Sequence, residues 1–195
     1  GQNRLTASLA LAICRGNIKG IISLESREKI KASSQAVEKI VSKGQPVYGI
    51  NTGFGPLCTT MISPEQTKKL QENLLKSHAV GLGEPIPIEI AKLMLVLKTH
   101  ALAQGYSGIQ ESTLDRILFF IENNIVPVVP KQGSVGASGD LAPLSHLFLP
   151  LIGLGKVHFK GEIISTAKLF QQLDLEPLQL GPKEGLALIN GTQFI

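Results

Sequence analysis

The stretch GSVGASGDLAPL, residues 133–144, constrains the fold more than any other part of the chain. Glycine recurs there at every third position, which is typical of an irregular loop rather than of a helix or a strand. Asp140 and Pro143 follow directly, and both residue types suit the first turn of a helix. We therefore predict a glycine-rich loop, closed by a helix that Asp140 caps and that runs to about Ile152.

The tripeptide Ala137-Ser138-Gly139 within this loop can cyclise. The amide nitrogen of Gly139 would attack the carbonyl carbon of Ala137, and loss of two waters would leave a methylidene-imidazolone ring. Glycine suits the attacking position because it has no Cβ and tolerates close approach of backbone atoms. Loss of the Ser138 hydroxyl creates an electrophilic methylene, and the N-terminus of the helix behind it would favour negative charge there.

Three simpler interpretations of the same loop compete with cyclisation. An ordinary turn is the commonest use of glycine and serine together. A phosphate loop is disfavoured because the glycine spacing is wrong and no Lys-Ser or Lys-Thr pair follows. A serine-hydrolase elbow is disfavoured because Asp140 stands where that motif needs glycine.

Three further motifs share the character of the loop: VYGINTGFG at 47–55, SHAVGLGEP at 77–85 and ALINGTQ at 187–193. In this order, and together with GSVGASGDLAPLSH at 133–146, they resemble the N-terminal part of the aromatic amino acid ammonia-lyases, closest to the branch that acts on histidine. The resemblance implies a mainly α fold with a few short β-strands. It also implies the N-terminal domain of the fumarase/aspartase-like (L-aspartase-like) helical superfamily.

Tyr48 lies between a short apolar run and the glycine-rich sequence INTGFG. A phenol that its surroundings deprotonate can remove a weakly acidic β-proton. Taken alone, a half-buried tyrosine that donates one hydrogen bond is the commoner case. The resemblance implies that Tyr48 is the catalytic base.

His78 ends a predicted helix that begins at the capping box Ser63-Pro64-Glu65-Gln66. Because His78 continues an apolar stripe through Leu70 and Leu74, a core histidine is the commoner interpretation. The resemblance instead implies that Ser77 and His78 face the substrate side chain. This pair suggests an imidazole ring as that side chain.

Asn190 falls in a helical pattern that begins after Pro182-Lys183-Glu184, and Gly191 within a helix would cost about 1 kcal/mol. A helix-surface asparagine is the simpler alternative to a binding role. The resemblance implies that Asn190 contacts the substrate or the ring, with Gln193 as a possible partner behind it.

The resemblance therefore implies elimination of ammonia from L-histidine to give urocanate. The one cofactor would be 4-methylidene-imidazol-5-one, made from Ala137-Ser138-Gly139. Two alternatives stay open. One is a tyrosine or phenylalanine ammonia-lyase or an aminomutase of the same family, and the other is a non-catalytic domain that serves binding or assembly.

Composition limits the kinds of partner that we expect for this chain. The net charge is +4, but the lysines are scattered, so we expect no nucleic acid. The four histidines show no metal-ligand spacing, and no apolar run is long enough for a membrane span, so we expect neither metal nor membrane. Two cysteines suggest a reducing, cytoplasmic compartment. Only 17% of residues are charged, which favours an oligomer, and the resemblance implies a homotetramer.

Periodicity predicts the remaining elements: helices at about Thr6–Cys14, around 30–41, from Pro87 and from a capping box of Ser112 and Asp115, and strands at 46–48 and in a hairpin over 156–165. We expect residues 1–182 to form the ring-bearing domain and residues 183–195 to begin a central helical bundle. The chain ends within an apolar helical pattern, so we expect a fragment that is inactive alone.

Overall fold

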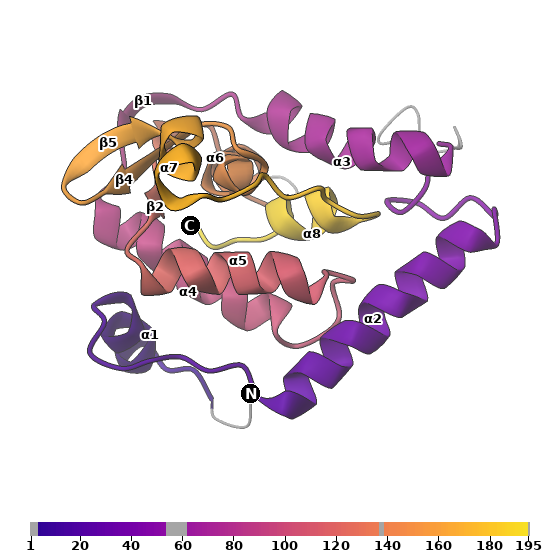
Figure 1. Ribbon diagram of the computed structural model, residues 1–195, viewed down its shortest axis with the longest axis horizontal. Helices are drawn as coiled ribbons and strands as arrows, with labels where there is room; N and C mark the ends of the chain where they lie inside the picture. Colours follow the sequence, from indigo (N-terminus) through magenta and orange to yellow (C-terminus); the bar gives the residue numbers. More distant parts are fainter. Residues whose placement is uncertain (1–3, 54–61, 137–138, 195) are drawn as a thin grey trace.

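The computed structural model describes residues 4–53, 62–136 and 139–194, and the chain is mainly helical, as predicted (Figure 1). The helices are α1 (Ala7–Cys14), α2 (Leu24–Ser42), α3 (Pro64–His78), α4 (Ile88–Leu102), α5 (Glu111–Glu122), α6 (Leu141–Phe148), the 3₁₀ helix η2 (Leu149–Ile152), α7 (Thr166–Leu173) and α8 (Glu184–Ile189). The strands are β1 (Leu82–Pro85), β2 (Val126–Pro127), β3 (Pro130–Gln132), β4 (Lys156–Phe159) and β5 (Glu162–Ser165).

Helices α4 and α5 form the centre of the molecule and pack against each other, and α8 packs against α3 and α6 (Figure 1). Leu95 of α4, Leu114 of α5 and Leu188 of α8 are each at most 1% exposed. Their burial removes apolar surface from water, which is the main favourable contribution to folding. The prediction that the helix after Pro87 is central and buried is confirmed.

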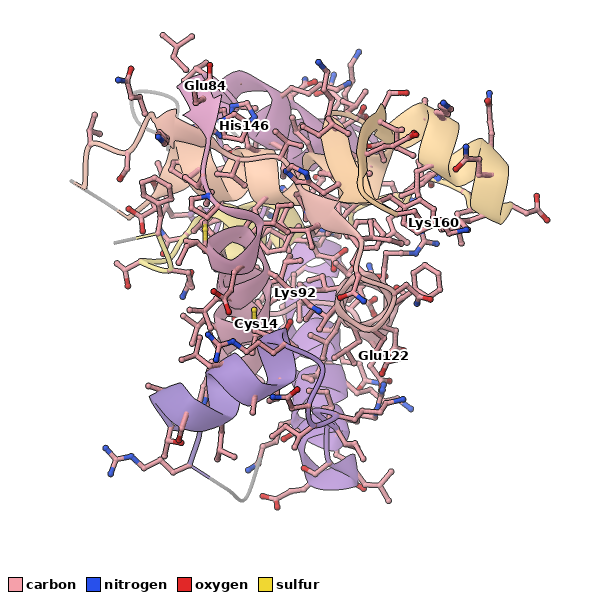
Figure 2. All side chains as sticks on the ribbon, turned by 90° about the vertical axis from the view of Figure 1, so that its left-hand side faces the viewer. Cys14, Glu84, Lys92, Glu122, His146 and Lys160 are labelled. Carbon is pink, nitrogen blue, oxygen red and sulfur yellow. The ribbon has the colours of Figure 1, made fainter. Side chains whose placement is uncertain are left out.

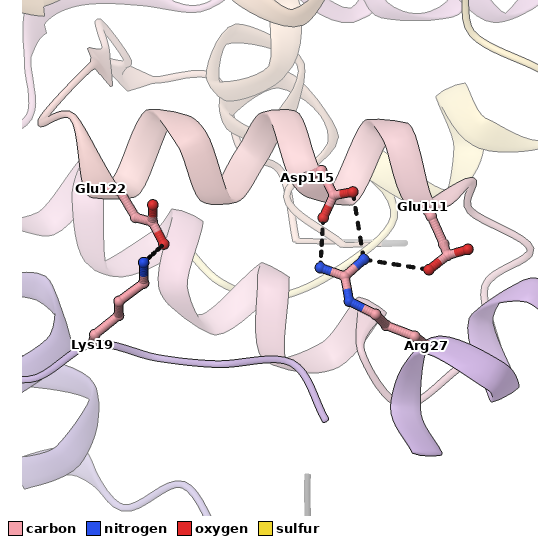
Figure 3. Close-up of polar contacts among 5 residues, drawn as sticks. All are labelled: Lys19, Arg27, Glu111, Asp115 and Glu122. Atoms are coloured by element: carbon pink, nitrogen blue, oxygen red, sulfur yellow. Dashed lines mark hydrogen bonds and ion pairs between the residues drawn. The ribbon is translucent and has the colours of Figure 1, made fainter. Parts of the chain in front are cut away.

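The predicted capping box of Ser112 and Asp115 is wrong. Helix α5 begins at Glu111, and its N-cap residue Gln110 makes no side-chain capping bond. The Gln110 N–H instead donates to Glu184 Oε1 at 2.9 Å, from α8. Ser112 already lies within α5, so it cannot be the N-cap residue. The Asp115 carboxylate instead accepts from Arg27 of α2 at 2.8 Å, and Arg27 also reaches Glu111 (Figure 3).

The hairpin is confirmed. Strands β4 and β5 pair antiparallel, and the connecting Lys160 and Gly161 both have positive φ, as a two-residue hairpin turn of type I′ requires. Strand β2, which the sequence did not indicate, pairs antiparallel with β4 on the side opposite β5.

The predicted strand at 46–48 is wrong, because this segment leads into a turn. The Asn51 side chain accepts from the Val47 N–H at 2.7 Å and donates to the Gln45 carbonyl at 2.8 Å. These bonds occupy backbone groups that a strand would offer to a neighbouring strand.

The helix after Asp140 begins at Leu141 as predicted, but it changes to the 3₁₀ helix η2 at Leu149. Pro150 lies at this change, where its missing N–H cannot continue the α-helical pattern. Asp140 is the N-cap residue by position, yet its side chain makes no capping bond. None of the helices in the three described ranges is long and apolar enough to cross a membrane.

Candidate active site

The SHAVGLGEP motif runs beside the glycine-rich loop. Strand β1 pairs antiparallel with β3, with Leu82 opposite Gln132. Just beyond that pair, a Cβ on Gly133 would lie 3.1 Å from the Cα of Gly81. The two backbones can approach this closely because both residues are glycines.

His146 of α6 supports the pairing of β1 with β3. Its Nε2 accepts a hydrogen bond from the Gly81 N–H at 2.9 Å, so Nδ1 carries the proton of the neutral ring. Partial burial lowers the pKa of His146. This contact was missed by sequence reasoning, although His146 is the last residue of the motif GSVGASGDLAPLSH.

Asp140 joins the loop to the ALINGTQ motif. Its backbone N–H donates to the Gly191 carbonyl at 2.7 Å, and its carboxylate accepts from the Phe194 N–H at 2.9 Å. The Ser134 hydroxyl donates to the same carboxylate at 2.7 Å. Asp140 is fully buried, so these charge-assisted bonds replace the water that the carboxylate has lost.

Gly139 has φ +107°, and a Cβ there would lie 2.7 Å from the Gly191 carbonyl oxygen. Only glycine fits this position without displacing the backbone of Gly191. Ala137 and Ser138 lie outside the described residues, so Gly139 is the part of the tripeptide whose surroundings are known.

His78 is half-buried at the end of α3, not on the buried core stripe. Its Nδ1 lies 2.9 Å from the Leu74 carbonyl and 3.1 Å from the Ser77 hydroxyl. Because a carbonyl oxygen only accepts, Nδ1 carries the proton in the neutral ring and Nε2 becomes an acceptor. Ser77 is exposed, and its hydroxyl donates to the same carbonyl at 3.2 Å.

Tyr48 lies in the turn after Val47, and its side chain is 63% exposed. The turn is held by Asn51, by a bond from the Gly49 N–H to the Thr52 hydroxyl at 3.3 Å, and by a bond from the Ile62 N–H to the Asn51 carbonyl at 2.9 Å. These bonds shape the turn, but they do not join it to the glycine-rich loop.

Asn190 does not lie inside a helix, as the sequence pattern had predicted. Helix α8 ends at Ile189, and Asn190 is its exposed, extended C-cap residue. The residues up to Phe194 are not helical either, so the predicted continuation of the apolar helix is wrong. The segment turns away because the Gly191 carbonyl bonds to Asp140 instead of to a following helical turn.

Lys98 of α4 supports this segment and was missed by sequence reasoning. Its side chain is buried, and its ammonium donates to the Asn190 carbonyl at 2.7 Å. Burial, with a smaller effect from the nearby Lys183, lowers the pKa of Lys98 to about 8. The one sequence signal was a lysine within the apolar run LMLVLK.

Two of the other motifs therefore contact the 133–146 motif at different points. The 77–85 motif contacts Gly133 and His146 beside the β1–β3 pair, and the 187–193 motif contacts Gly139 and Asp140 through Gly191. Among the described residues, no group of three or more His, Cys, Asp or Glu side chains could hold a metal ion. The junction is thus built from backbone amides, carbonyls, one carboxylate and one buried ammonium.

Comparison with known proteins shows to which family the chain belongs. The family model described as aromatic amino acid lyase matches residues 5–195. The chain belongs to the aromatic amino acid lyase family. Its expected membership of the fumarase/aspartase-like helical superfamily is confirmed.

Individual members of the aromatic amino acid lyase family agree with this assignment. Histidine ammonia-lyase of Symbiobacterium thermophilum is 49% identical over 189 residues, which cover 97% of this chain and 37% of that protein. The structure of histidine ammonia-lyase from Trypanosoma cruzi is similar with a TM-score of 0.89 and 40% identity, over 97% of this chain and 37% of that one. Tyrosine aminomutase from Streptomyces globisporus gives a TM-score of 0.90 at 34% identity, over 97% and 36%. The chain thus spans little more than a third of each.

Proposed function

We propose that this chain is the part of a histidine ammonia-lyase that carries its electrophile, and that the protein eliminates ammonia from L-histidine to give urocanate. The observation that carries the proposal is the 49% identity to a histidine ammonia-lyase over almost the whole chain. Identity to the aminomutase is lower, at 34%, although the fold is equally similar.

The residues around Gly139 fit a ring made from Ala137-Ser138-Gly139. The cradle that Gly191 forms admits no Cβ at Gly139, and Asp140 anchors the following backbone through Ser134 and Phe194. This rigid support would hold the tripeptide in a bent conformation that favours attack of one backbone group on another. Once formed, a methylidene-imidazolone supplies an electrophile that ordinary side chains lack.

Tyr48 is proposed as the base that takes the β-proton of the substrate. Its exposed phenol belongs to a turn whose backbone is fixed by Asn51 and Thr52, so the side chain is presented from a defined position. A general base must come within hydrogen-bond reach of the proton that it removes, and substrate would have to lie between Tyr48 and the tripeptide.

His78 and Ser77 are proposed to select the imidazole. With the His78 Nδ1 proton held by the Leu74 carbonyl, Nε2 can accept an N–H of the substrate ring. A site that accepts this N–H discriminates against an apolar phenyl ring, because His78 would then lose its hydrogen-bond partner.

Asn190 is proposed to bind the substrate carboxylate or the carbonyl of the ring through its amide N–H groups, with Gln193 behind it. Asn190 is exposed next to Gly191, and Gly191 contacts Gly139. This neighbourhood supports the proposal, because Asn190 directly precedes the residue that contacts Gly139.

A homotetramer in the cytoplasm is proposed for the whole protein. Val80, Leu82 and Val135, which belong to the two paired motifs, are between 65% and 88% exposed. Apolar side chains gathered in this way favour burial against other subunits. The division of the chain into residues 1–182 and 183–195 stays a prediction.

The test is made on the complete protein. Its intact mass should fall short of the sequence mass by two waters, borohydride should modify residues 137–139, and L-histidine should be converted to urocanate and ammonia. Ser138→Ala should restore the full mass and abolish turnover. Products from tyrosine or phenylalanine, or a β-amino acid, would favour another lyase or an aminomutase, and a full-mass, inactive protein would favour a binding domain.

A further inference from the structure

A buried ammonium lies beside the segment that contacts Gly139. Lys98 is 3% exposed, and its Nζ donates to the Asn190 carbonyl at 2.7 Å. An apolar side chain would fill this position of α4 without the cost of taking a charge out of water. A lysine at this position therefore calls for a role besides packing.

Gly191 lies close to both Lys98 and Gly139. On one face of Gly191, a Cβ would lie 3.1 Å from Lys98 Nζ and would overlap the Gln193 side chain. The carbonyl oxygen of Gly191 would lie 2.7 Å from a Cβ added to Gly139. Gly191 is thus packed between the ammonium and Gly139.

Gln193 adds a second polar group to the same place. Its Oε1 is buried and has no hydrogen-bond partner among the described residues. Oε1 and Lys98 Nζ both lie close to the point where a Cβ of Gly191 would be, so a buried positive charge and a buried acceptor flank the same glycine.

Lys92 provides an internal comparison on the same helix. It is also buried, at 7% exposure, but its ammonium donates to the Asn124 side chain and lies close to Cys14 of α1 (Figure 2). Lys92 has no bond to the 187–193 motif in the contacts of the described chain. The two lysines therefore differ in which segment they hold, not in burial.

We propose that Lys98 is a positioning residue of the ammonia-lyase reaction, whose ammonium holds the Asn190 carbonyl and, through Gly191, presses this segment against Gly139. The inference rests on the proposed function. Lys98 would act on the direction of the Asn190 amide and on the support of the tripeptide, without touching substrate.

The test compares Lys98→Met with Lys92→Met in the complete protein. We expect Lys98→Met to keep the mass deficit of two waters but to lose about 100-fold in kcat, since misplacement by about 1 Å has effects of this size. Lys92→Met should lower the melting temperature by a similar amount and leave kcat within about twofold of the parent, because Lys92 holds Asn124 and not the 187–193 segment. Lys98→Arg, which keeps the charge and the donor, should recover most of the lost activity.

A second measurement follows kcat against pH in the parent protein and in Lys98→Arg. Because the pKa of Lys98 is lowered to about 8 by burial and by Lys183, the ammonium loses its proton just above neutral pH. A charge-assisted bond is about twice as strong as a neutral one, so kcat should fall as the pH rises through this range, and Lys98→Arg should move the fall to higher pH.

The outcomes separate the two proposals. A parent protein without the mass deficit or without urocanate would refute the proposed function, whatever Lys98 does. A parent with both, in which folded Lys98→Met keeps full kcat or kcat shows no fall above pH 8, would overturn the role of Lys98 alone.

Discussion

The Gly81 N–H donates to Nε2 of His146 at 2.9 Å, which joins the segment after α3 to helix α6 across 65 positions of the sequence. A Cβ on Gly81 would lie 3.1 Å from this imidazole and from the Gln132 carbonyl. The contact therefore sets the distance between the 77–85 motif and the glycine-rich loop.

This contact should depend on pH. The pKa of His146 is lowered from 6.5 by burial, so the folded state favours the neutral ring. The stabilisation is complete above the unfolded pKa and is lost as the pH falls through the lower folded pKa, where Nε2 gains a proton and stops accepting. Hydrogen exchange at Gly81, corrected for the intrinsic rate, should speed up as the pH drops below 6.5.

The control is His146→Gln, whose carbonyl accepts at all these pH values. Its Gly81 exchange should follow the intrinsic rate over the same range. His158, whose pKa burial also lowers, stays in both proteins, so the difference isolates His146. Equal pH dependence in the two proteins would contradict the assignment.

Gly139→Ala should prevent ring formation. The added Cβ meets the Gly191 carbonyl at 2.7 Å and the residue keeps a φ of +107°, so we expect a loss of about 3 kcal/mol in local stability. Intact mass should show no loss of water. Gly136→Ala is the matched control, since Gly136 also has positive φ, at +66°, but no atom of the described residues lies within 4 Å of a Cβ there. A normal mass deficit is expected for this variant.

Glu184→Gln should destabilise the fold although it changes one atom. The buried carboxylate accepts from the Gly181 N–H at 2.6 Å and from the Gln110 N–H at 2.9 Å, on separate oxygens. An amide would turn its NH₂ group towards one of these donors, which should cost about 2 kcal/mol and lower the melting temperature. Exposed Glu176→Gln should leave the melting temperature unchanged; a similar fall in both would count against this explanation.

Tyr48→Phe should separate catalysis from stability. Because the phenol is 63% exposed, its loss should leave the melting temperature and the ring mass unchanged. Removal of a general base should lower kcat about 1000-fold. Tyr106, the other tyrosine and 88% exposed, is the control, and Tyr106→Phe should keep full activity. Equal kcat in the parent and Tyr48→Phe would remove Tyr48 from the mechanism.

Local sequence signals predicted a helix or hairpin well where the residues that determine it lie within one segment. Ser63 with Pro64 begins α3, and the Lys160-Gly161 pair closes the β4–β5 hairpin, as expected. The errors fall where a distant partner competes. Asp115 accepts from Arg27 of α2 instead of closing the predicted capping box. The Gly191 carbonyl accepts from the Asp140 N–H, and the segment after α8 is not helical.

The sequence by itself determined the family, the four motifs and the tripeptide that can cyclise, because these depend on residue identity and on spacing along the chain. Only the tertiary structure decided that His146 holds Gly81, that Gly191 leaves room for nothing but glycine at position 139, and that a buried lysine lies behind Asn190. Such contacts depend on distances between atoms from segments far apart in the chain, and periodicity along one segment carries no information about them.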